Sequence, residues 1–280
     1  MRLDTCVLIP THKRPHAQLT TKSLRRQGYT GRIIYVVDDE DPTLPEYIEQ
    51  FGDDVVVFSK EDAATQTDDG HNWGDRTSAV YARNFSFRAV KDAGYRYFIM
   101  LDDDYSMWYY RFREDRTYGV TRIKSLDLLF ASLVEYLSEA PLRCISISHS
   151  GDHAGGGAGK TEIGANRKAL SVYVCDVERP YQFRGMMEDY ITHIHEQSRG
   201  NTMLSVTMAQ YVCKEALHQN EGGLHDVYES RGMYTSCFFT VMYAPSCCRV
   251  DAQSPDKMYH AINGPAAYPR IIHEQHRKAR

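Results

Sequence analysis

The segment Tyr97-Phe98-Ile99-Met100-Leu101-Asp102-Asp103-Asp104 decides the fold. Its five consecutive apolar residues predict a buried strand. Three carboxylates follow directly, and acids this close repel one another unless a cation or a proton relieves them. Strands of an α/β sheet hold ligands at their carboxyl ends. The segment therefore predicts a hard-metal site for Mg²⁺ or Mn²⁺ that faces a phosphate-bearing substrate.

The chain before this segment alternates strand and helix patterns. Apolar runs predict strands at 5–9, 33–37 and 55–58. Helical patterns are present at 16–27, 44–51 and 78–93, whereas the polar residues 59–75 predict a loop. This alternation is typical of an α/β fold with a mostly parallel central sheet, right-handed crossovers and flanking helices.

The second half of the chain is less regular. Helical patterns at 125–138 and 188–199 and strand patterns at 143–148, 169–175 and 203–206 are the clearest. No repeat or linker interrupts the 280 residues, so a single domain is expected.

Composition is that of an ordinary globular protein, with 42% apolar and 25% charged residues. No run is long enough to span a membrane, and the start of the chain lacks the apolar region of a signal peptide, so we expect a cytoplasmic protein without a membrane partner. The seven cysteines lack metal-type spacing and lie mostly in apolar runs, which predicts buried free thiols.

A net charge of −4 gives no general attraction to nucleic acid. Binding to a polyanion would therefore depend on local basic clusters, although such clusters are also typical of solvated faces. Two clusters are candidates: Lys13, Arg14, Lys22, Arg25 and Arg26, and the tail at 270–280 with Arg277, Lys278 and Arg280.

Polar residues follow the first two predicted strands. The first ends in Pro10 and Thr11 with Arg14 just beyond, and the second ends in Asp38-Asp39. Both ends should meet beside the aspartates at 102–104, where an acid can accept hydrogen bonds from a ribose or base and a basic loop can hold phosphate. Arg83, near the start of the helix at 78–93, could donate bidentate hydrogen bonds to a diphosphate or form a surface ion pair.

Residues 154–161 fit a relaxed phosphate-loop pattern. A true phosphate loop follows a strand and opens a helix, but here a strand-like run follows Thr161. We therefore interpret the glycine-rich segment 150–160 as a flexible active-site loop rather than as the nucleotide site of a triphosphatase.

Two later groups could join the acidic strand end. Glu188 and Asp189 stand at a turn-to-helix junction, where acids serve either as helix caps or as a general base. His260 follows Tyr259 near the end of the chain, and its imidazole could complete a metal shell of carboxylate and diphosphate oxygens.

In this order the motifs resemble those of GT-A glycosyltransferases, which use nucleotide-sugar donors. The chain is most similar to the TET/JBP-associated glycosyltransferases of phages, which modify hydroxymethylated pyrimidines in DNA. The resemblance covers nearly the whole chain, and Tyr259-His260 replaces an expected His-His pair. The supporting stretches are 82–84, 166–174, 179–189, 221–223, 232–234, 238–246, 259–262 and 269–272.

The resemblance implies a GT-A, Rossmann-like fold in one domain, with a nucleotide-sugar half at 1–105 and an acceptor half at 106–280. Asp102, Asp104 and His260 would hold Mn²⁺ or Mg²⁺ on the donor diphosphate. Asp103 would contact the sugar or brace its neighbours. The groups that would frame the donor, expected to be a UDP-sugar, are Pro10, Thr11, Arg14, Asp38, Asp39, Arg83, Asp102 and Asp103.

The resemblance also implies the reaction. Asp189 or Glu188 would deprotonate an acceptor hydroxyl, and attack opposite the leaving group would invert the anomeric centre. The expected acceptor is 5-hydroxymethylcytosine in DNA, in the host cytoplasm if the protein is encoded by a phage. Two alternatives stay open: a glycosyltransferase with a protein, lipid or glycan acceptor, and a non-catalytic sugar-nucleotide or nucleic-acid binding protein.

Overall fold

The computed structural model describes residues 2–70, 74, 76–149, 169–213, 224–254 and 257–267. Its strands are β1 (Thr5–Pro10), β2 (Ile33–Asp38), β3 (Val55–Phe58), β4 (Tyr97–Met100), β5 (Tyr105–Phe112), β6 (Tyr118–Arg122), β7 (Cys144–His149), β8 (Tyr173–Asp176), β9 (Met203–Cys213), β10 (Cys248–Ser254) and β11 (Lys257–Ile262). Its helices are α1 (Leu19–Arg26), α2 (Leu44–Phe51), α3 (Lys60–Thr65), α4 (Val80–Asp92), α5 (Leu126–Glu139), α6 (Glu188–Ser198), α7 (Leu224–Tyr243) and α8 (Gly264–Ala267).

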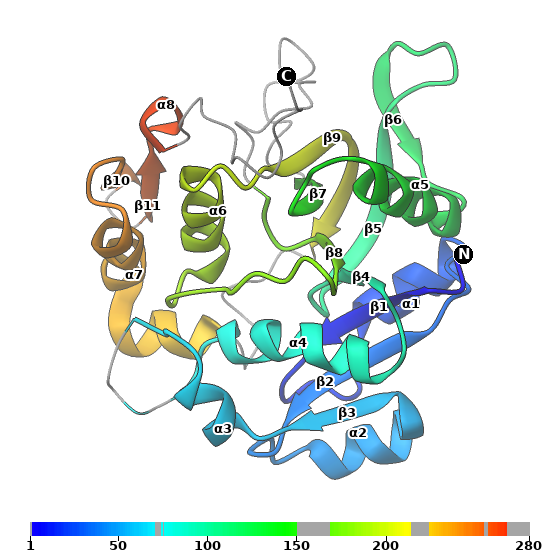
Figure 1. Cartoon of the computed structure of the whole chain (residues 1–280), viewed down its shortest axis with the longest axis horizontal. Coiled ribbons are helices and arrows are strands. Elements are labelled where there is room, and N and C mark those ends of the chain that lie inside the picture. Colours follow the sequence, from blue (N-terminus) through cyan, green and yellow to red (C-terminus); the bar gives the residue numbers. More distant parts are fainter. Residues whose placement is uncertain are drawn as a thin grey trace.

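A nine-stranded sheet organises the described residues, in the order β3-β2-β1-β4-β8-β7-β9-β5-β6 (Figure 1). Strands β1, β2, β3 and β4 are all parallel to one another, and β7 is parallel to β9. Strand β8 lies antiparallel between β4 and β7, and β5 lies antiparallel between β9 and β6. The predicted α/β class with a parallel core is confirmed, and antiparallel strands extend the sheet beyond that core.

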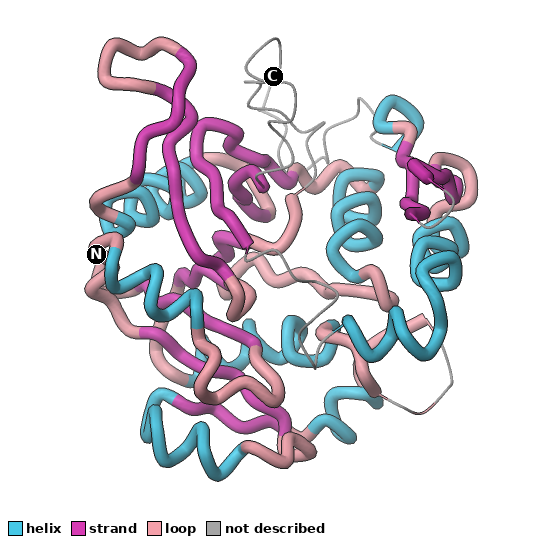
Figure 2. The backbone as a smooth tube through the Cα atoms, turned by 180° about the vertical axis from the view of Figure 1, so that it is seen from behind, coloured by secondary structure: helices cyan, strands magenta, loops and turns pink. Residues whose placement is uncertain are grey.

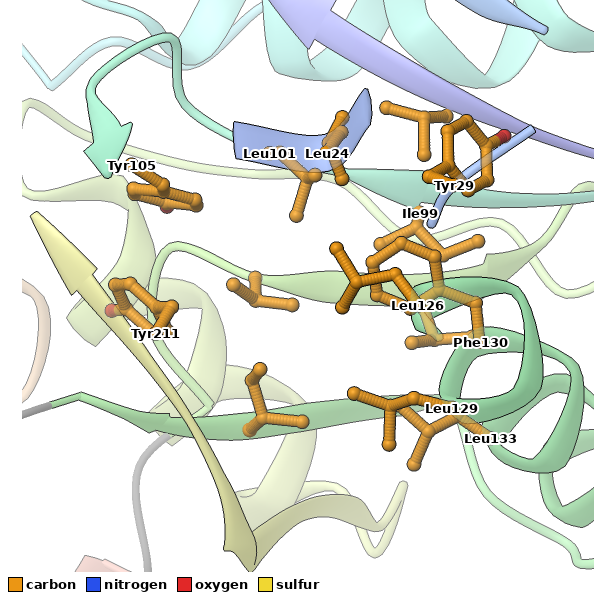
Figure 3. Close-up of a cluster of buried hydrophobic side chains, with 14 of the residues drawn as sticks. Leu24, Tyr29, Ile99, Leu101, Tyr105, Leu126, Leu129, Phe130, Leu133 and Tyr211 are labelled. Atoms are coloured by element: carbon orange, nitrogen blue, oxygen red, sulfur yellow. The ribbon is translucent and has the colours of Figure 1, made fainter. Parts of the chain in front are cut away.

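Helices cover both faces of the parallel core because alternate strand residues point to opposite faces. On one face Val7, Ile9 and Ile99 belong to a buried cluster with residues of α1, α2 and α5. Figure 3 shows Ile99 in this cluster with Leu126 and Phe130 of α5. On the other face Leu8 and Met100 pack with α4. Burial on both faces explains why these strands are continuous apolar runs in the sequence rather than alternating ones.

The chain reverses its direction of travel across the sheet at β1. From β1 it proceeds to β2 and β3 on one side, and it then returns to place β4 on the other side of β1. In open α/β sheets this switch leaves a crevice at the carboxyl ends of the two strands, where ligands bind. The loop after Pro10 and the acids at 102–104 therefore meet at the same edge.

Two helices end beside a glycine. Gly28 comes directly after the C-cap of α1, and Gly94 directly after that of α4. Their φ angles are 79° and 82°. Glycine adopts this left-handed conformation without the steric cost that a Cβ atom imposes.

Two local expectations were wrong. Residues 59–75 do not form only a loop, since Ser59 accepts a hydrogen bond from Asp62 N and caps helix α3. Residues 105–122 form a β5–β6 hairpin that the sequence pattern does not predict, and β9 extends to Cys213 rather than ending near 206. The antiparallel β5–β9 pairing explains the length of β9, because each strand supplies hydrogen-bond partners to the other.

All seven cysteines lie in the described ranges and are free thiols, and six of them are buried. The glycine-rich segment 150–160, the phosphate-loop pattern at 154–161 and the basic tail at 270–280 lie outside the described residues. In the part of the chain that is described, no helix is long and apolar enough to cross a membrane.

Candidate active site

Asp103 ties the acidic turn after β4 to the loop after β1. Its carboxylate accepts hydrogen bonds from Thr11 Oγ1 at 2.7 Å and from Arg14 Nη1 at 2.9 Å. Burial raises the pKa of Asp103, while Arg14 and Thr11 act in the opposite direction. Both carboxylate oxygens accept hydrogen bonds within the protein, so Asp103 joins the two loops, and its contact with the sugar stays a prediction.

Asp102 and Asp104 flank this brace and are each partly exposed. Asp102 Oδ1 accepts from Arg83 Nη2 at 2.9 Å, and its Oδ2 accepts from Tyr105 OH at 3.0 Å. Burial, together with the charges of Asp102 and Asp103, raises the pKa of Asp104 to about 7. A divalent cation would relieve the part of this shift that comes from repulsion between the acids, so the site suits such an ion.

Arg83 joins this acidic turn to helix α6. Its Nε donates to Glu188 Oε1 at 2.9 Å while Nη2 holds Asp102. The guanidinium lies 5.3 Å from the Tyr173 ring centre and 5.7 Å from that of Phe183. Burial alone would lower the pKa of Arg83, but the two carboxylates keep it well above its usual value. Arg83 is thus an internal bridge here, and its contact with a diphosphate stays a prediction.

Glu188 and Asp189 are both in the first turn of α6 but occupy different environments. Glu188 is 2% exposed, and its Oε2 has no hydrogen-bond partner among the described residues. Burial and the charge of Asp189 raise the pKa of Glu188 to about 7, against the effect of Arg83. Asp189 is partly exposed, and its Oδ1 accepts a hydrogen bond from Tyr190 N at 2.7 Å. Only Asp189 of the pair therefore presents its side chain to solvent.

His260 lies on β11, buried against α6 and α7. Its Nδ1 is 3.1 Å from Thr240 Oγ1, and its ring centre is 3.6 Å from that of Tyr190. In the described ranges, no three His, Cys, Asp or Glu side chains are grouped so that they could hold a metal ion. Asp102, Asp104 and His260 therefore do not form a preassembled three-ligand centre, and the role of His260 as a ligand stays a prediction.

The end of β2 carries the predicted nucleotide-binding acids. Asp38 is buried and accepts from His12 Nδ1 at 2.8 Å, with Lys60 Nζ at 3.4 Å. Burial alone would raise the pKa of Asp38, but His12 and Lys60 lower it overall. Asp39 is exposed and accepts from Lys60 N at 2.9 Å. Pro10, the last residue of β1, is paired with Val36, so it borders the same edge.

Several residues of the site gave no signal in the sequence. Tyr47 OH lies 2.8 Å from Thr11 Oγ1, and Thr20 Oγ1 donates to Asp102 O at 2.5 Å. Cys213, paired in register with Tyr105, has its thiol pKa raised by burial and by the charges of Asp104 and Asp102. Tyr105 could have been suspected because it directly follows the acids, whereas the other three are brought in from distant segments.

Comparison with known proteins identifies the family of the chain. A family model described as TET-Associated Glycosyltransferase matches residues 5–223, which include the acids at 102–104 and 188–189 but not His260. The match identifies the protein as a glycosyltransferase. The chain belongs to the TET-Associated Glycosyltransferase family. No curated protein sequence matches it.

Similar solved structures include glucosyl-3-phosphoglycerate synthase from Mycobacterium tuberculosis with Mn²⁺ and UDP-glucose. It is 13% identical with a TM-score of 0.49, and the match covers 92% of this chain and 86% of that one. S. aureus TarS is 12% identical with a TM-score of 0.45, over 84% of this chain and 39% of that one. GalNAc-T7 with UDP, GalNAc and Mn²⁺ is 15% identical with a TM-score of 0.46, over 75% of this chain and 44% of that one.

Proposed function

We propose that the protein is a metal-dependent, inverting GT-A glycosyltransferase. It would move a sugar from a UDP-sugar onto the hydroxyl of a 5-hydroxymethylpyrimidine base in DNA, with 5-hydroxymethylcytosine as the expected base. The observation that carries the proposal is the Arg83 bridge, because it brings the acids after β4 and the acids of α6 together. Membership of the glycosyltransferase family supplies the reaction class.

Asp102 and Asp104 are the groups that would hold Mn²⁺ or Mg²⁺. Both are partly exposed, and burial together with the charges of Asp102 and Asp103 raises the pKa of Asp104. Hard carboxylate oxygens suit both ions. When bound, the metal would neutralise the charge that develops on the nucleotide diphosphate as it leaves. Arg83 and Tyr105 hold Asp102 in place, so little side-chain entropy would be lost on binding.

Asp189 is the group that would accept the proton of the acceptor hydroxyl. It is the exposed member of the acidic pair, whereas Glu188 is buried and paired with Arg83. The first turn of a helix stabilises the carboxylate form, because unpaired backbone N–H groups and the helix dipole favour negative charge there. Proton removal by Asp189 would make the hydroxyl nucleophilic for attack opposite the diphosphate.

The nucleotide would lie against the ends of β1 and β2. Asp39 has an exposed carboxylate that could accept hydrogen bonds from ribose or base. Thr11, Arg14 and Asp103 are joined by hydrogen bonds through the Asp103 carboxylate and would shape the site as a rigid wall. Arg14 would reach a phosphate only by exchanging part of its contact with Asp103.

The DNA acceptor is supported by the family name and by the resemblance of the motifs. A base in a duplex must leave the stack to reach a catalytic carboxylate, which costs a few kcal/mol. Contacts with DNA phosphates would offset that cost and make binding depend on salt. A glycosyltransferase with a protein, lipid or glycan acceptor is the alternative.

One experiment separates these acceptors. The protein is incubated with Mn²⁺ and a panel of nucleotide sugars, and either unmodified DNA or DNA that contains 5-hydroxymethylcytosine is added. We expect the mass of one sugar to appear on the modified strand alone, and to disappear when a chelator is present. If modified DNA gains no mass with any donor, although a UDP-sugar raises the Tm in a Mn²⁺-dependent manner, the DNA acceptor is wrong.

A further inference from the structure

We propose that helix α1 and the β5–β6 hairpin form the docking surface for the duplex that flanks the acceptor base. The inference rests on the proposed DNA acceptor and names where that DNA would lie. We call this surface the basic face. It consists of Lys22, Arg25 and Arg26 on α1 and of Arg111, Arg113, Arg116 and Arg122 on the hairpin.

In the described ranges, none of these seven side chains forms an ion pair, and the only acids at the hairpin tip are Glu114 and Asp115. Most arginines elsewhere form ion pairs: Arg2, Arg14, Arg32, Arg76, Arg83, Arg88, Arg96, Arg143, Arg179, Arg184 and Arg249. In a chain with a net charge of −4, these seven cations outnumber the two acids of the hairpin tip and create a local positive potential. A polyanion is the complementary partner.

The two parts of the basic face adjoin where α1 meets the start of β5. Helix α1 packs against β5, and Arg26 Nη2 donates to Ser106 O at 2.6 Å. The hairpin projects beyond the body of the protein, which Figures 1 and 2 show from opposite sides. Lys22, Arg25, Arg26, Arg113, Arg116 and Arg122 are all exposed. A long, rigid ligand could therefore contact both the helix and the hairpin.

Backbone conformation at the hairpin tip gives a second, independent argument. Arg116 has a φ of 63°, a left-handed conformation that glycine and asparagine adopt more readily. Asp115 stabilises this turn, because its Oδ1 accepts from Thr117 N at 2.9 Å and from Thr117 Oγ1 at 2.7 Å. An arginine at such a position costs about 1 kcal/mol or more, and strain of this kind tends to occur at functional sites.

The distance between the tip and the active site suits a duplex. Strand β5 begins at Tyr105, directly after Asp104, and has eight residues. At roughly 3.3 Å per residue it spans about 25 Å. Successive phosphates of one DNA strand are about 3.4 Å apart along the axis, so the hairpin could follow roughly seven of them. DNA held there would extend away from a base bound at the site.

An alternative explanation exists, because β6 is an edge strand and charged side chains on edge strands prevent aggregation. The test is the affinity for a duplex of about 30 base pairs, measured by fluorescence anisotropy between about 50 and 200 mM salt. The test variant is R113A/R116N/R122A. The control is R88A/K91A, which removes exposed charges from α4 that are paired with Asp92 and Glu178.

We expect the hairpin variant to bind the duplex at least about tenfold more weakly, with a salt slope reduced by about 0.9 for each phosphate that it no longer neutralises. The control should match the wild type. If the hairpin variant keeps the affinity and slope of the wild type, or aggregates while its affinity stays unchanged, the basic face serves only the edge strand. Failure of the wild type to bind any duplex would overturn the proposal as well.

Arg116 allows a sharper test. R116G relieves the left-handed strain and removes one charge, so we expect an unchanged or higher Tm together with weaker DNA binding. R116K should restore much of the binding. A lower Tm with unchanged affinity in R116G would show that Arg116 is structural.

The outcomes for docking and for the acceptor are separable. If the wild type binds DNA through the basic face but transfers no sugar to 5-hydroxymethylcytosine, the docking surface stands and the proposed acceptor fails. If it transfers sugar to modified DNA while the hairpin variant binds normally, the acceptor stands and the docking surface fails.

Discussion

Arg83 Nε donates a hydrogen bond to Glu188 Oε1 across 2.9 Å, and both side chains are buried. The same guanidinium holds Asp102 through Nη2. These contacts join two residues that are 105 positions apart in the chain. They hold the start of α6 at the acidic turn after β4. Because the bridge has little access to water, its loss should affect both stability and the placement of Asp189.

Removal of the Arg83 guanidinium should destabilise the fold strongly. At a pH above about 7, where Glu188 is ionised, R83M leaves it buried without its counter-charge, and breaking a buried pair of this kind costs about 3–5 kcal/mol. The free energy of unfolding from urea titration is the measurement. The double variant R83M/E188Q should recover part of the stability, because the uncompensated charge is then gone. A decrease below about 1 kcal/mol in R83M would mean that the bridge contributes little.

Neutralising each of the two acids of α6 should have different effects on kcat. D189N is expected to lower kcat by about two to four orders of magnitude, the usual scale for a missing general base, while the KM for the donor changes little. E188Q keeps the shape of the side chain and should retain far more activity than D189N. The comparison is steady-state kinetics with a saturating acceptor. Equal decreases of kcat in both variants would contradict the assignment of Asp189 as the base.

Metal binding should depend on pH through Asp104. Its pKa is raised to about 7 by burial and by neighbouring acids, so below that pH a proton competes with the cation. The rise in Tm caused by Mn²⁺ should therefore be larger at a pH above about 7 than below it. D104N should abolish most of the rise, whereas D189N should preserve it. A Mn²⁺ effect in D104N equal to that of the wild type would exclude Asp104 as a ligand.

In the metal-free protein, the contribution of Glu188 to stability should be lost as the pH rises from about 4.5 to about 7. In the folded state the pKa of Glu188 is raised from 4.5 to about 7. A raised folded pKa contributes stability that is complete below the unfolded pKa and is lost as the pH passes the folded pKa. The pKa of Asp104 is raised from 3.8 to about 7, so its contribution to stability is also lost as the pH rises through this range. Urea unfolding across this range should show a shallower decline in E188Q than in the wild type.

Much of the fold could be predicted because its signals are local. The apolar runs at 5–9, 33–37 and 97–101 identify the buried strands, and Gly28 and Gly94 identify two helix ends. Their order also predicts that the strand ends meet at one edge. The β5–β6 hairpin escaped prediction because its mixed aromatic and basic residues follow no simple period, and its antiparallel pairing with β9 comes from a distant part of the chain.

By itself, the sequence determined the α/β class, the acids at 102–104 and 188–189, and the order of motifs that identifies the family. Strand burial and metal-type carboxylates follow from residue types and spacing, so they can be read locally. Only the tertiary structure decided which partner each acid has. Asp103 and Glu188 are buried partners of Arg14 and Arg83. Asp102 also pairs with Arg83 but, like Asp104 and Asp189, it stays partly exposed. Burial and partner choice depend on contacts between distant segments, and these contacts separate the environments of neighbouring carboxylates.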